Sequence, residues 1–371
     1  MTTLWSANDV LKLRGDALPR LDNLEVGSFP GLRSDMIYWD MWPIQTPDGY
    51  PALIDGSAMW MALACPRLDD PHARHLASRI HWMSQVDGAW VDEGPVLAGV
   101  KGEYEREWSG CAIWESGILS LYFTGAGLAS DPGGYEQALY YTTTTFDGDI
   151  AKVEWSMPEL LLEPSPAFYA KADAHDGEPG KIKALRDPAY FRDPQSGGEF
   201  IAFTASLANS SSPFNGAFGL AKKEGEEWIS LPPIIHADGV NNELERAHLV
   251  FYDERYYAFW STQSHTFEPN LRHAPTGLYG MVSKSIAGPY VPLNGHGLVA
   301  ANPACCPCET YSWFVTNDLL VSSFIDYPGT VYKTPPSEPK LAAATFMGRP
   351  APLFQIELKA ASSRLPGVMN A

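Results

Sequence analysis

Hydrophobic positions along the chain occur in short runs that are rich in aromatic and β-branched residues and end at turn residues. Runs of this kind occupy residues 36–39, 119–124, 138–143, 200–203, 249–251, 256–259, 278–282 and 319–324. Turn composition separates them, for example at residues 46–49, 115–117, 146–148 and 195–198. Almost no segment keeps a helical period for more than ten residues. The pattern predicts an all-β fold, and a large sandwich, a jelly roll or a β-propeller of about twenty strands in five blades would suit the length.

The two ends of the chain add little to this pattern. Residues 6–13 read SANDVLKL, which predicts a short helix with Ser6 or Asn8 as its N-cap. Residues 1–10 lack the basic start and apolar stretch of a secretory signal, so the cytoplasm is the default location. No low-complexity tract or linker divides the chain, and we therefore expect one domain over residues 1–371.

Charge and composition narrow the classes of partner. The 371 residues include 44 acidic and 26 basic ones, for a net charge of −18. Such a surface repels phosphate backbones and anionic lipid heads, so neither nucleic acid nor membrane is an expected partner. The five cysteines, an odd number, do not suggest a disulfide framework. We interpret them as buried or inert thiols and His72, His75 and His81 as surface or capping residues, and we predict no metal site.

The first candidate chemistry is the motif Trp39-Asp40-Met41-Trp42-Pro43 at the end of a predicted strand. A carboxylate between two indoles suits an aromatic-walled sugar pocket from which water is partly excluded. A surface aspartate beside two core tryptophans is the alternative.

A second motif is Arg186-Asp187-Pro188, which lies at a predicted strand start, where Pro188 keeps Asp187 extended. This triplet is either a site or an ordinary structural ion pair. The similar triplet that contains Asp193 runs into turn residues, so we expect Asp193 on an exposed hairpin.

The third motif contains Glu243, Glu245 and Arg246. In a strand, residues 243 and 245 share one face, and two like charges there raise the pKa of one carboxyl, as a general acid requires. Arg246 would point the opposite way and hold the strand; a solvated acidic edge is the alternative. Together, the three motifs suggest retaining glycoside chemistry, with a carboxylate nucleophile, a carboxylic acid and a third carboxylate that binds sugar hydroxyls.

In this order the motifs resemble glycoside hydrolase family 68, the bacterial levansucrases, inulosucrases and related β-fructofuranosidases. The landmarks of the resemblance occupy residues 38–45, 107–110, 185–188, 215–219, 243–246, 277–280, 292–295, 297–299 and 310–312. The resemblance implies a five-bladed β-propeller over residues 34–358 with the active site in a central funnel, between a helical or extended segment (residues 1–33) and a tail (359–371). It also implies that the protein is extracellular, against the default from the N-terminus.

The resemblance also implies roles for single residues. Asp40 would be the nucleophile, Asp187 the transition-state stabiliser and Glu245 the acid/base. Sugar contacts are implied for Trp39, Trp108, Arg186, Glu243 and Tyr311, and Ser109 would place the nucleophile.

Two positions depart from the family pattern. Asn242 stands where some members have an aspartate that helps hold a structural calcium, so neither a metal nor another cofactor is expected. Gln263 replaces an acceptor-side Arg or His, which would change how the acceptor is held.

The primary hypothesis is a sucrose-cleaving fructosyltransferase that releases glucose and passes the fructosyl group to sucrose, a fructan or oligosaccharide, or water. A β-fructofuranosidase that mainly hydrolyses sucrose and a non-catalytic carbohydrate-binding propeller are the alternatives. We expect a monomer, and the sequence predicts neither linkage type nor product length.

Overall fold

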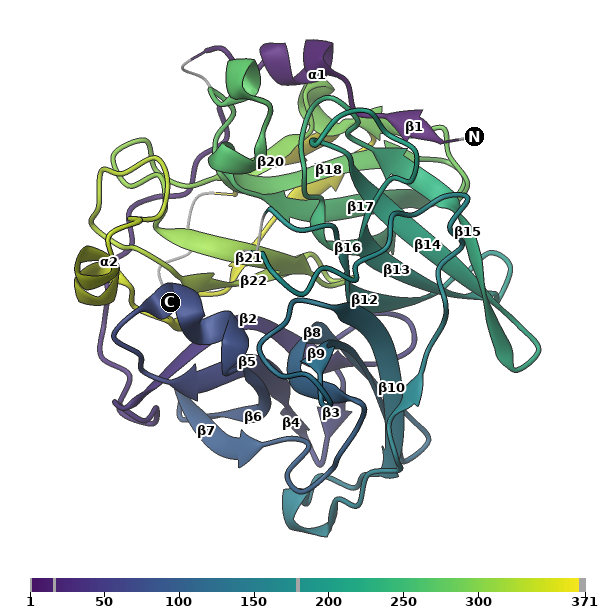
Figure 1. The fold of residues 1–371 in the computed structure, drawn as a ribbon, viewed down its shortest axis with the longest axis vertical. Helices are drawn as coiled ribbons and strands as arrows, with labels where there is room; N and C mark the ends of the chain where they lie inside the picture. The colour runs from purple at the N-terminus through teal and green to yellow at the C-terminus, as the bar shows by residue number, and fades with distance from the viewer. Residues whose placement is uncertain (1, 16–17, 178–180, 367–371) are drawn as a thin grey trace.

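The computed structural model describes residues 2–15, 18–177 and 181–366, and its elements are nearly all strands (Figure 1). The α-helices among the described residues are α1 (Ala7–Leu11) and α2 (Pro339–Thr345). Ser6 caps α1 and forms a capping box with Asp9, which confirms Ser6 as one of the two predicted caps. The described residues also form short 3-10 helices: η1 (Pro71–Leu76), η2 (Ile150–Lys152), η3 (Ser264–Thr266), η4 (Pro269–Leu271) and η5 (Leu293–Gly295). No helix in the described ranges is long and apolar enough to cross a membrane.

The strands pair mainly with their neighbours in sequence and form four larger sheets. One sheet has eight strands: β2 (Met36–Gln45), β5 (Trp60–Pro66), β6 (Arg79–Val86), β7 (Ala89–Pro95), β8 (Tyr104–Glu115), β9 (Ile118–Leu128), β10 (Gln137–Thr145) and β11 (Glu159–Leu160). Its two antiparallel halves, β2-β5-β6-β7 and β8-β9-β10-β11, meet at a parallel pair of β2 with β8. The eight-stranded sheet is therefore two consecutive four-stranded units.

In the other larger sheets, most neighbouring strands are again consecutive in the sequence. The next sheet contains β1 (Thr3–Leu4), β12 (Leu185–Arg192), β13 (Glu199–Ser206), β14 (Gly216–Glu224) and β15 (Glu227–His236). A third contains β16 (Glu245–Tyr252), β17 (Arg255–Thr262), β18 (Gly277–Ser283), β19 (Val291–Pro292) and β20 (Leu298–Ala301). The fourth contains β21 (Thr310–Val315), β22 (Leu320–Ile325), β23 (Arg349–Pro350) and β24 (Phe354–Gln355). Two small hairpins are β3 (Leu53–Ile54) with β4 (Ser57–Ala58), and β25 (Glu357–Lys359) with β26 (Ser362–Arg364).

The first strands of the units, β2, β8, β12, β16 and β21, contact one another in a ring around the middle of the molecule (Figure 1). β2 contacts β8, β8 contacts β12, β12 contacts β16, β16 contacts β21, and β21 contacts β2. Apart from the ends of the strands, most of their residues are buried. The ring brings together residues that lie far apart in the sequence.

Each of these five strands breaks its register at one point, through a β-bulge or similar irregularity. The breaks lie between Trp39 and Trp42, Trp108 and Gly110, Arg186 and Ala189, Glu245 and His248, and Tyr311 and Phe314. In four of them a residue other than glycine adopts positive φ: Asp40 (48°), Asp187 (58°), Arg246 (52°) and Ser312 (60°). Bulges redirect side chains, and strained backbone of this kind gathers at functional sites.

Two expectations differ from the structure. Asp187 was expected in extended backbone ahead of Pro188, but its φ of 58° is in the left-handed region. Asp193 does follow β12 at a hairpin, but its side chain is buried because Tyr256 and Ser196 donate hydrogen bonds to it. Near the C-terminus, β26 pairs with β25, and the backbone N–H of Ser363 donates a hydrogen bond to Asn294 Oδ1. The N-terminal segment also joins the body of the fold, because β1 pairs in parallel with β15.

Candidate active site

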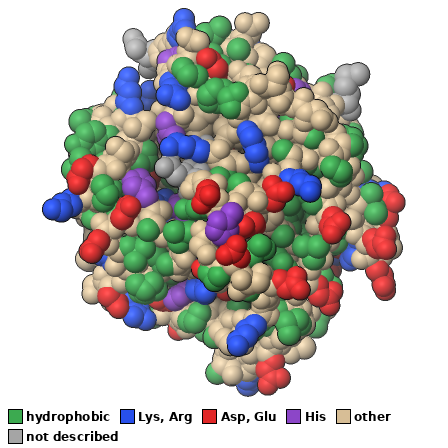
Figure 2. Space-filling view, viewed as in Figure 1, with side chains coloured by type: hydrophobic (Ala, Val, Ile, Leu, Met, Phe, Trp, Pro, Cys, Tyr) green, Lys and Arg blue, Asp and Glu red, His purple; other side chains and the backbone are tan. Residues whose placement is uncertain are grey.

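A cavity of about 750 Å³ is lined by residues of the first strands β2, β16 and β21, together with residues of η1 and of connecting segments. Figure 2 shows charged and histidine side chains around a hollow on one face of the molecule. The cavity is lined by Trp39, Asp40, Asp70, His72, Ala73, Arg74, His75, Leu76, Tyr135, Lys181, Glu243, Glu245, Gln263, His265, Arg272, Tyr311, Phe324, Asp326, Tyr327, Thr334, Pro335 and Ser337. Of the residues predicted from the sequence, Trp39, Asp40, Glu243, Glu245, Gln263 and Tyr311 line it directly.

Asp40 lies at the bulge of β2, and Ser109 holds its carboxylate. The Ser109 hydroxyl donates a 2.6 Å hydrogen bond to Asp40 Oδ2. The bulge of β8 that carries Ser109 lies beside that of β2 because the two strands pair in parallel. The hydroxyl therefore fixes one carboxylate oxygen of a residue that lines the cavity.

Asp187 is buried at the bulge of β12 and accepts two hydrogen bonds on one oxygen. The Thr204 hydroxyl donates to Asp187 Oδ2 at 2.9 Å, and the Arg246 backbone N–H donates to the same oxygen at 3.2 Å. Burial raises the pKa of Asp187, the Arg186 guanidinium opposes that rise, and the nearby Asp40 carboxylate adds to it. Asp187 therefore joins the bulges of β12 and β16 through a hydrogen bond, and it interacts electrostatically with Asp40 on β2.

Arg186 joins the two glutamates of the third motif. Its Nη2 donates to Glu243 Oε1 at 2.6 Å and to Glu245 Oε1 at 3.4 Å, while the Tyr311 hydroxyl donates to Glu245 Oε2. Glu243 precedes β16 and is not in the strand, so the prediction of alternating strand faces is wrong at this residue. The expected coupling of the two carboxyls is present: burial first, and then the Glu243 charge, raises the pKa of Glu245 to about 8.

Arg246 connects its own strand, β16, to β2 and β21. Its Nη1 donates to Met41 O at 3.1 Å and to Ser312 O at 3.4 Å, across β16, β2 and β21. The guanidinium also lies over the rings of Trp42 and Phe314. The predicted role of Arg246 in holding its strand is therefore present, and it extends to two neighbouring strands.

Two tryptophans meet at the 3-10 helix η1. Trp108 Nε1 donates to His75 O at 2.8 Å, and Arg106 Nε donates to the same carbonyl at 2.9 Å. The His75 ring lies edge-on to the rings of Trp39 and Trp108, with centroids 6.2 Å and 6.0 Å away. The interpretation of His75 as a surface or capping residue is wrong, because the residue packs between both predicted sugar-stacking walls.

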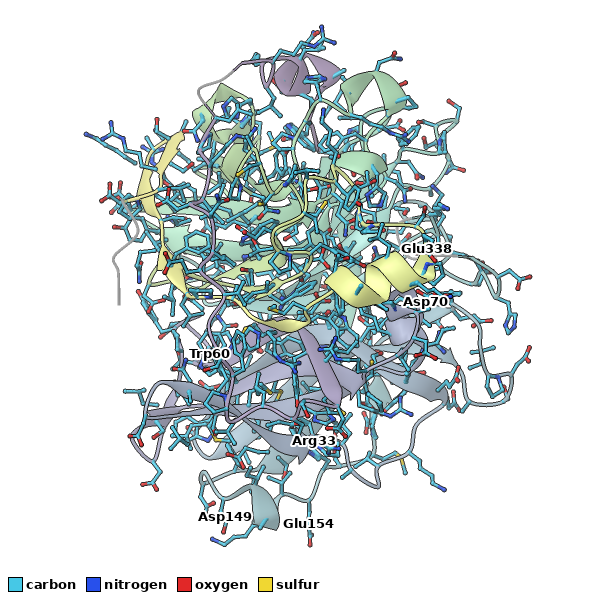
Figure 3. The ribbon with its side chains drawn as sticks, turned by 90° about the vertical axis from the view of Figure 1, so that its left-hand side faces the viewer. Arg33, Trp60, Asp70, Asp149, Glu154 and Glu338 are labelled. Atoms are coloured by element: carbon cyan, nitrogen blue, oxygen red, sulfur yellow. The ribbon has the colours of Figure 1, made fainter. Side chains whose placement is uncertain are left out.

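Helix α2 covers η1 from outside. Asp70 caps η1 and Glu338 caps α2, and Figure 3 shows these two caps next to each other. His72 Nε2 lies 2.7 Å from Pro336 O, which fastens η1 to the segment before α2. His81 is buried beside Asp92, with 2.8 Å between Nδ1 and Oδ1, so its assignment to the surface is also wrong.

Asn242, the residue at which the resemblance put a structural calcium in doubt, accepts a hydrogen bond from the Lys183 ammonium group. Lys183 Nζ donates to Pro213 O at 2.9 Å, to Asn215 Oδ1 at 2.5 Å and to Asn242 Oδ1 at 3.2 Å. A second cation does not fit among these oxygens, because the ammonium already uses them. In the described part of the chain, no group of three or more His, Cys, Asp or Glu side chains has the arrangement of a metal site.

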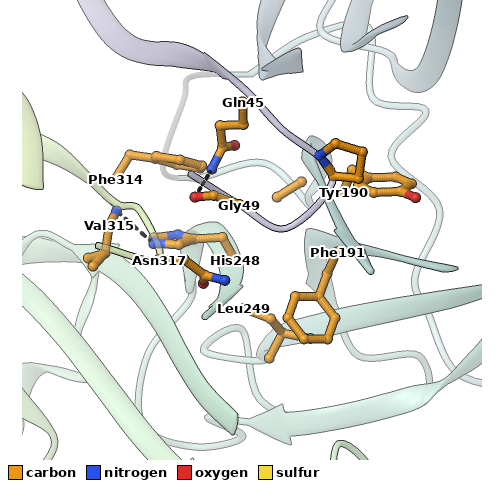
Figure 4. A pocket seen from close by; sticks show the side chains of 11 residues that line it. Gln45, Gly49, Tyr190, Phe191, His248, Leu249, Phe314, Val315 and Asn317 are labelled. Carbon is orange, nitrogen blue, oxygen red and sulfur yellow. Dashed lines mark hydrogen bonds between the residues drawn. The ribbon is translucent and has the colours of Figure 1, made fainter. Parts of the chain in front are cut away.

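A second, water-sized cavity of about 10 Å³ lies at the far ends of the ring strands (Figure 4). His248 lines it, and its ring is held at both nitrogens: Nε2 accepts from the Val315 N–H at 2.9 Å, so Nδ1 carries the proton and donates to Arg246 O at 2.7 Å. Burial lowers the pKa of His248 to about 3.

Sequence reasoning missed Arg74, His75, Asp326 and Tyr327, all of which line the large cavity. Arg74 and His75 come from η1, a six-residue segment with no strand pattern of its own. Asp326 and Tyr327 follow directly after β22. The one available signal was the position of these two polar residues just beyond the predicted strand run at residues 319–324, after Ile325.

Comparisons with known proteins agree with this architecture. The family model described as Levansucrase/Invertase, glycoside hydrolase family 68, matches residues 1–215 and 209–368. A levansucrase of Erwinia amylovora is 30% identical, with 87% of this chain and 86% of that protein aligned. A levansucrase of Rahnella aquatilis is 28% identical, with 87% of this chain and 86% of that protein aligned.

Solved structures give the same result. An inulosucrase from Halalkalicoccus jeotgali bound to kestose superposes with a TM-score of 0.88 at 30% identity, over 100% of this chain and 96% of that one. The Bacillus subtilis levansucrase, at 19% identity and a TM-score of 0.79 over 98% and 95% of the two chains, supports the fold alone. On these matches, the chain belongs to glycoside hydrolase family 68, the levansucrase/invertase family.

Proposed function

We propose that this protein is a retaining fructosyltransferase that cleaves sucrose, releases glucose and transfers the fructosyl group to a sugar or to water. The observation that carries the proposal is that Asp40 and Glu245 line one cavity, and that the buried carboxyl of Asp187, at the bulge of a third ring strand, interacts electrostatically with both. The names of the relatives support the substrate: several are levansucrases, and one inulosucrase holds kestose.

The first half of the reaction uses Asp40 and Glu245. The Asp40 carboxylate attacks the anomeric carbon of the fructosyl unit, and the bond from that carbon to the glucosyl oxygen breaks. Glu245 gives its proton to that oxygen, and glucose leaves. Its raised pKa, about 8, keeps Glu245 protonated at neutral pH, as this step requires.

The second half of the reaction returns Asp40 to a free carboxylate and Glu245 to its protonated form. Glu245, now ionised, removes a proton from an acceptor hydroxyl or from water, and the acceptor oxygen attacks the anomeric carbon. The ester bond to Asp40 breaks, and two inversions give net retention. Asp187 accepts hydrogen bonds from fructosyl hydroxyls and stabilises the positive charge that develops on the ring.

The remaining predicted residues orient the catalytic carboxyl groups or contact the sugar. Ser109 orients Asp40 through its 2.6 Å hydrogen bond, and Tyr311 and Arg186 hold Glu245. Trp39 and Trp108 would stack on sugar rings. Glu243 and Gln263 would contact sugar hydroxyls from the wall of the cavity.

We also propose that the chain forms a five-bladed propeller with this cavity as its central funnel. The closed ring of contacts among β2, β8, β12, β16 and β21 supports it, and so does the sequential antiparallel order outward from each of them. The parallel pairing of β2 with β8 joins the first two blades into one hydrogen-bonded sheet.

Incubation with sucrose tests the function directly. Glucose and fructose are measured separately, and we expect more free glucose than free fructose, because part of the fructosyl product is transferred. Asp40→Asn should lower glucose release by several orders of magnitude, since covalent catalysis is lost. Asp55→Asn is the matched control, because Asp55 is exposed on the β3–β4 turn and also adopts positive φ. Absence of glucose release by the wild type would refute the proposal.

Hydrolysis as the main outcome is the second candidate function. The uncharged Gln263 at the cavity wall favours it, because a neutral side chain holds an acceptor less firmly than a charged one. A fructose-to-glucose ratio near one in the same assay would select this candidate. A binding propeller without catalysis predicts no release of either sugar.

A further inference from the structure

Three of the five cysteines lie close together in the loop of residues 302–309, between β20 and β21. All five are free thiols, but their exposure differs. Cys305 is exposed and Cys306 is half-buried, whereas the other three are buried. The expectation of buried thiols is therefore wrong at Cys305, and the loop presents two adjacent sulfurs to solvent.

Hydrogen bonds hold this loop in one shape. The Cys306 N–H donates to Pro303 O at 3.1 Å, and the Glu309 N–H donates to Cys306 O at 3.1 Å, so one turn follows another. The buried Asn302 side chain spans the loop, because its Nδ2 donates to Pro307 O at 3.0 Å. The two accessible sulfurs are therefore held in place by the fold before any ligand binds.

The thiols of Cys305 and Cys306 interact with each other through a side-chain hydrogen bond. Cys305 Sγ also donates to Asn23 Oδ1 at 3.2 Å. Partial burial raises the pKa of Cys306, and the Cys305 thiol and the Glu309 carboxylate add to the rise. Because the thiolate and not the thiol attacks disulfides, a raised pKa slows exchange with disulfides at neutral pH.

A disulfide between the two neighbours does not suit this geometry either. Adjacent Cα atoms lie about 3.8 Å apart across a trans peptide bond, whereas disulfides usually join Cα atoms about 4.4–6.8 Å apart. Cys308 is the other partner within the loop, but it is 2% exposed, and its carbonyl accepts from the Tyr327 N–H at 2.9 Å. The pair therefore stays reduced and can bond to one ligand through both sulfurs.

The chemistry of the pair selects a neutral, thiophilic ligand. Soft sulfur atoms prefer soft acceptors, and the nearby Glu309 carboxylate disfavours an anion. Trivalent arsenic in the form RAs(OH)2 is neutral and bonds to two sulfurs. Two As–S bonds form, two As–O bonds break, and each oxygen leaves as water with its own hydrogen and one thiol proton. No electrons are exchanged, so the step needs no oxidant.

The loop is also joined to the wall of the large cavity. The Asp326 N–H donates to Glu309 O at 2.8 Å, next to the bond from the Tyr327 N–H to Cys308 O. Asp326 and Tyr327 line the cavity, and neither Cys305 nor Cys306 does. We propose that Cys305 and Cys306 form a dithiol site for a trivalent arsenical outside the sugar cavity, and that its occupation displaces the cavity wall at residues 326 and 327.

Intact-mass measurement with phenylarsine oxide tests the site without any catalysis. The wild type should gain one phenylarsenic group less two hydrogens, and excess dimercaptopropanol should remove it. Cys305→Ser and Cys306→Ser should each weaken binding by about 100-fold or more, because two linked contacts exceed one by about 10²–10⁴. Cys308→Ala is the matched control and should bind as the wild type does, and each variant is checked by thermal unfolding. No mass gain, a loss in only one serine variant, or an equal loss in Cys308→Ala would overturn the site.

The connection to the cavity wall has two readouts. When phenylarsine oxide is bound, amide hydrogen exchange at Asp326 and Tyr327 should become faster, because their acceptors belong to the loop. Glucose release from sucrose should fall, by up to about a hundredfold for a displacement near 1 Å, and Cys305→Ser should keep its activity in the reagent. Only this second readout rests on the proposed function. Unchanged exchange at full occupancy would overturn the connection, whereas a wild type that releases no glucose would refute the proposed function alone.

Discussion

The acid/base role of Glu245 makes a prediction about the pH dependence of catalysis. Glu243 and Glu245 both accept hydrogen bonds from Arg186 Nη2, at 2.6 Å and 3.4 Å, so at most 6.0 Å separates the two accepting oxygens. Replacing Glu243 by Gln removes one negative charge at nearly constant shape. The proton on Glu245 then becomes easier to lose, because the like charge that disfavoured its carboxylate is gone.

The size of the effect follows from Coulomb's law. Two unit charges about 6 Å apart at an effective dielectric constant of about 20 interact by about 2.8 kcal/mol, or about two pKa units. The pKa of Glu245, about 8 in the native protein, should therefore fall to about 6. Because protonated Glu245 is the active form, kcat/KM of the wild type should decline above about pH 8 and that of the variant above about pH 6.

The assay is initial glucose release from dilute sucrose between pH 4.5 and pH 9.5 at constant ionic strength. Loss of a sugar contact lowers the height of the Glu243→Gln profile, so the position of its alkaline limb is the quantity to compare. Glu226→Gln, on an exposed turn, is the matched control and should keep the wild-type limb. An alkaline limb that stays near pH 8 in Glu243→Gln, or moves upward, would refute the coupling of the two glutamates.

Three further predictions concern position and stability. Ser109→Ala should lower kcat about tenfold with little change in KM for sucrose, because Asp40 loses the 2.6 Å hydrogen bond that orients it; an unchanged kcat would show that the hydroxyl is dispensable. Lys183→Met should lower the free energy of unfolding in urea by about 1–3 kcal/mol, since two asparagine oxygens and a carbonyl lose their donor, whereas EDTA should leave the wild type unaffected. His248 has a native pKa of about 3, below its value of about 6.5 in the unfolded chain, so its contribution to stability is complete above pH 6.5 and is lost as the pH falls toward 3. In His248→Leu, unfolding free energy plotted against pH should therefore be flatter over this window by about 1.4 kcal/mol per pH unit, and identical slopes would contradict the assignment.

Local patterns in the sequence predicted much of this molecule. Short aromatic and β-branched runs and the turn residues between them predicted the strands, and the three acidic motifs contain carboxyl groups that interact with one another in the structure. The sequence singles out Asp40 because tryptophans lie on either side of it. It singles out Asp187 because that residue stands between an arginine and a proline.

The remaining features depend on contacts between distant parts of the chain. Asp193 is buried because Tyr256, on another sheet, donates to it, and no local signal carries that contact. His75 lies between two tryptophans because η1 folds over β2 and β8. The pairing of Glu243 with Glu245 depends on Arg186, 57 and 59 residues away in the sequence, and not on the strand alternation that suggested it.

The bulges of the ring strands affect the order in which the protein loses its activity and its secondary structure in denaturant. Asp40, Asp187 and the residue after Glu245 occupy left-handed backbone conformations, each of which costs about 1 kcal/mol or more when the surroundings no longer impose it. Mild denaturant should therefore relax the bulges first, and enzymatic activity should disappear before the sheets lose their circular dichroism. Glycine adopts positive φ without strain, so Asp40→Gly should unfold at a higher urea concentration than the wild type. The variant should turn over no sucrose, because it gains stability by losing the nucleophile.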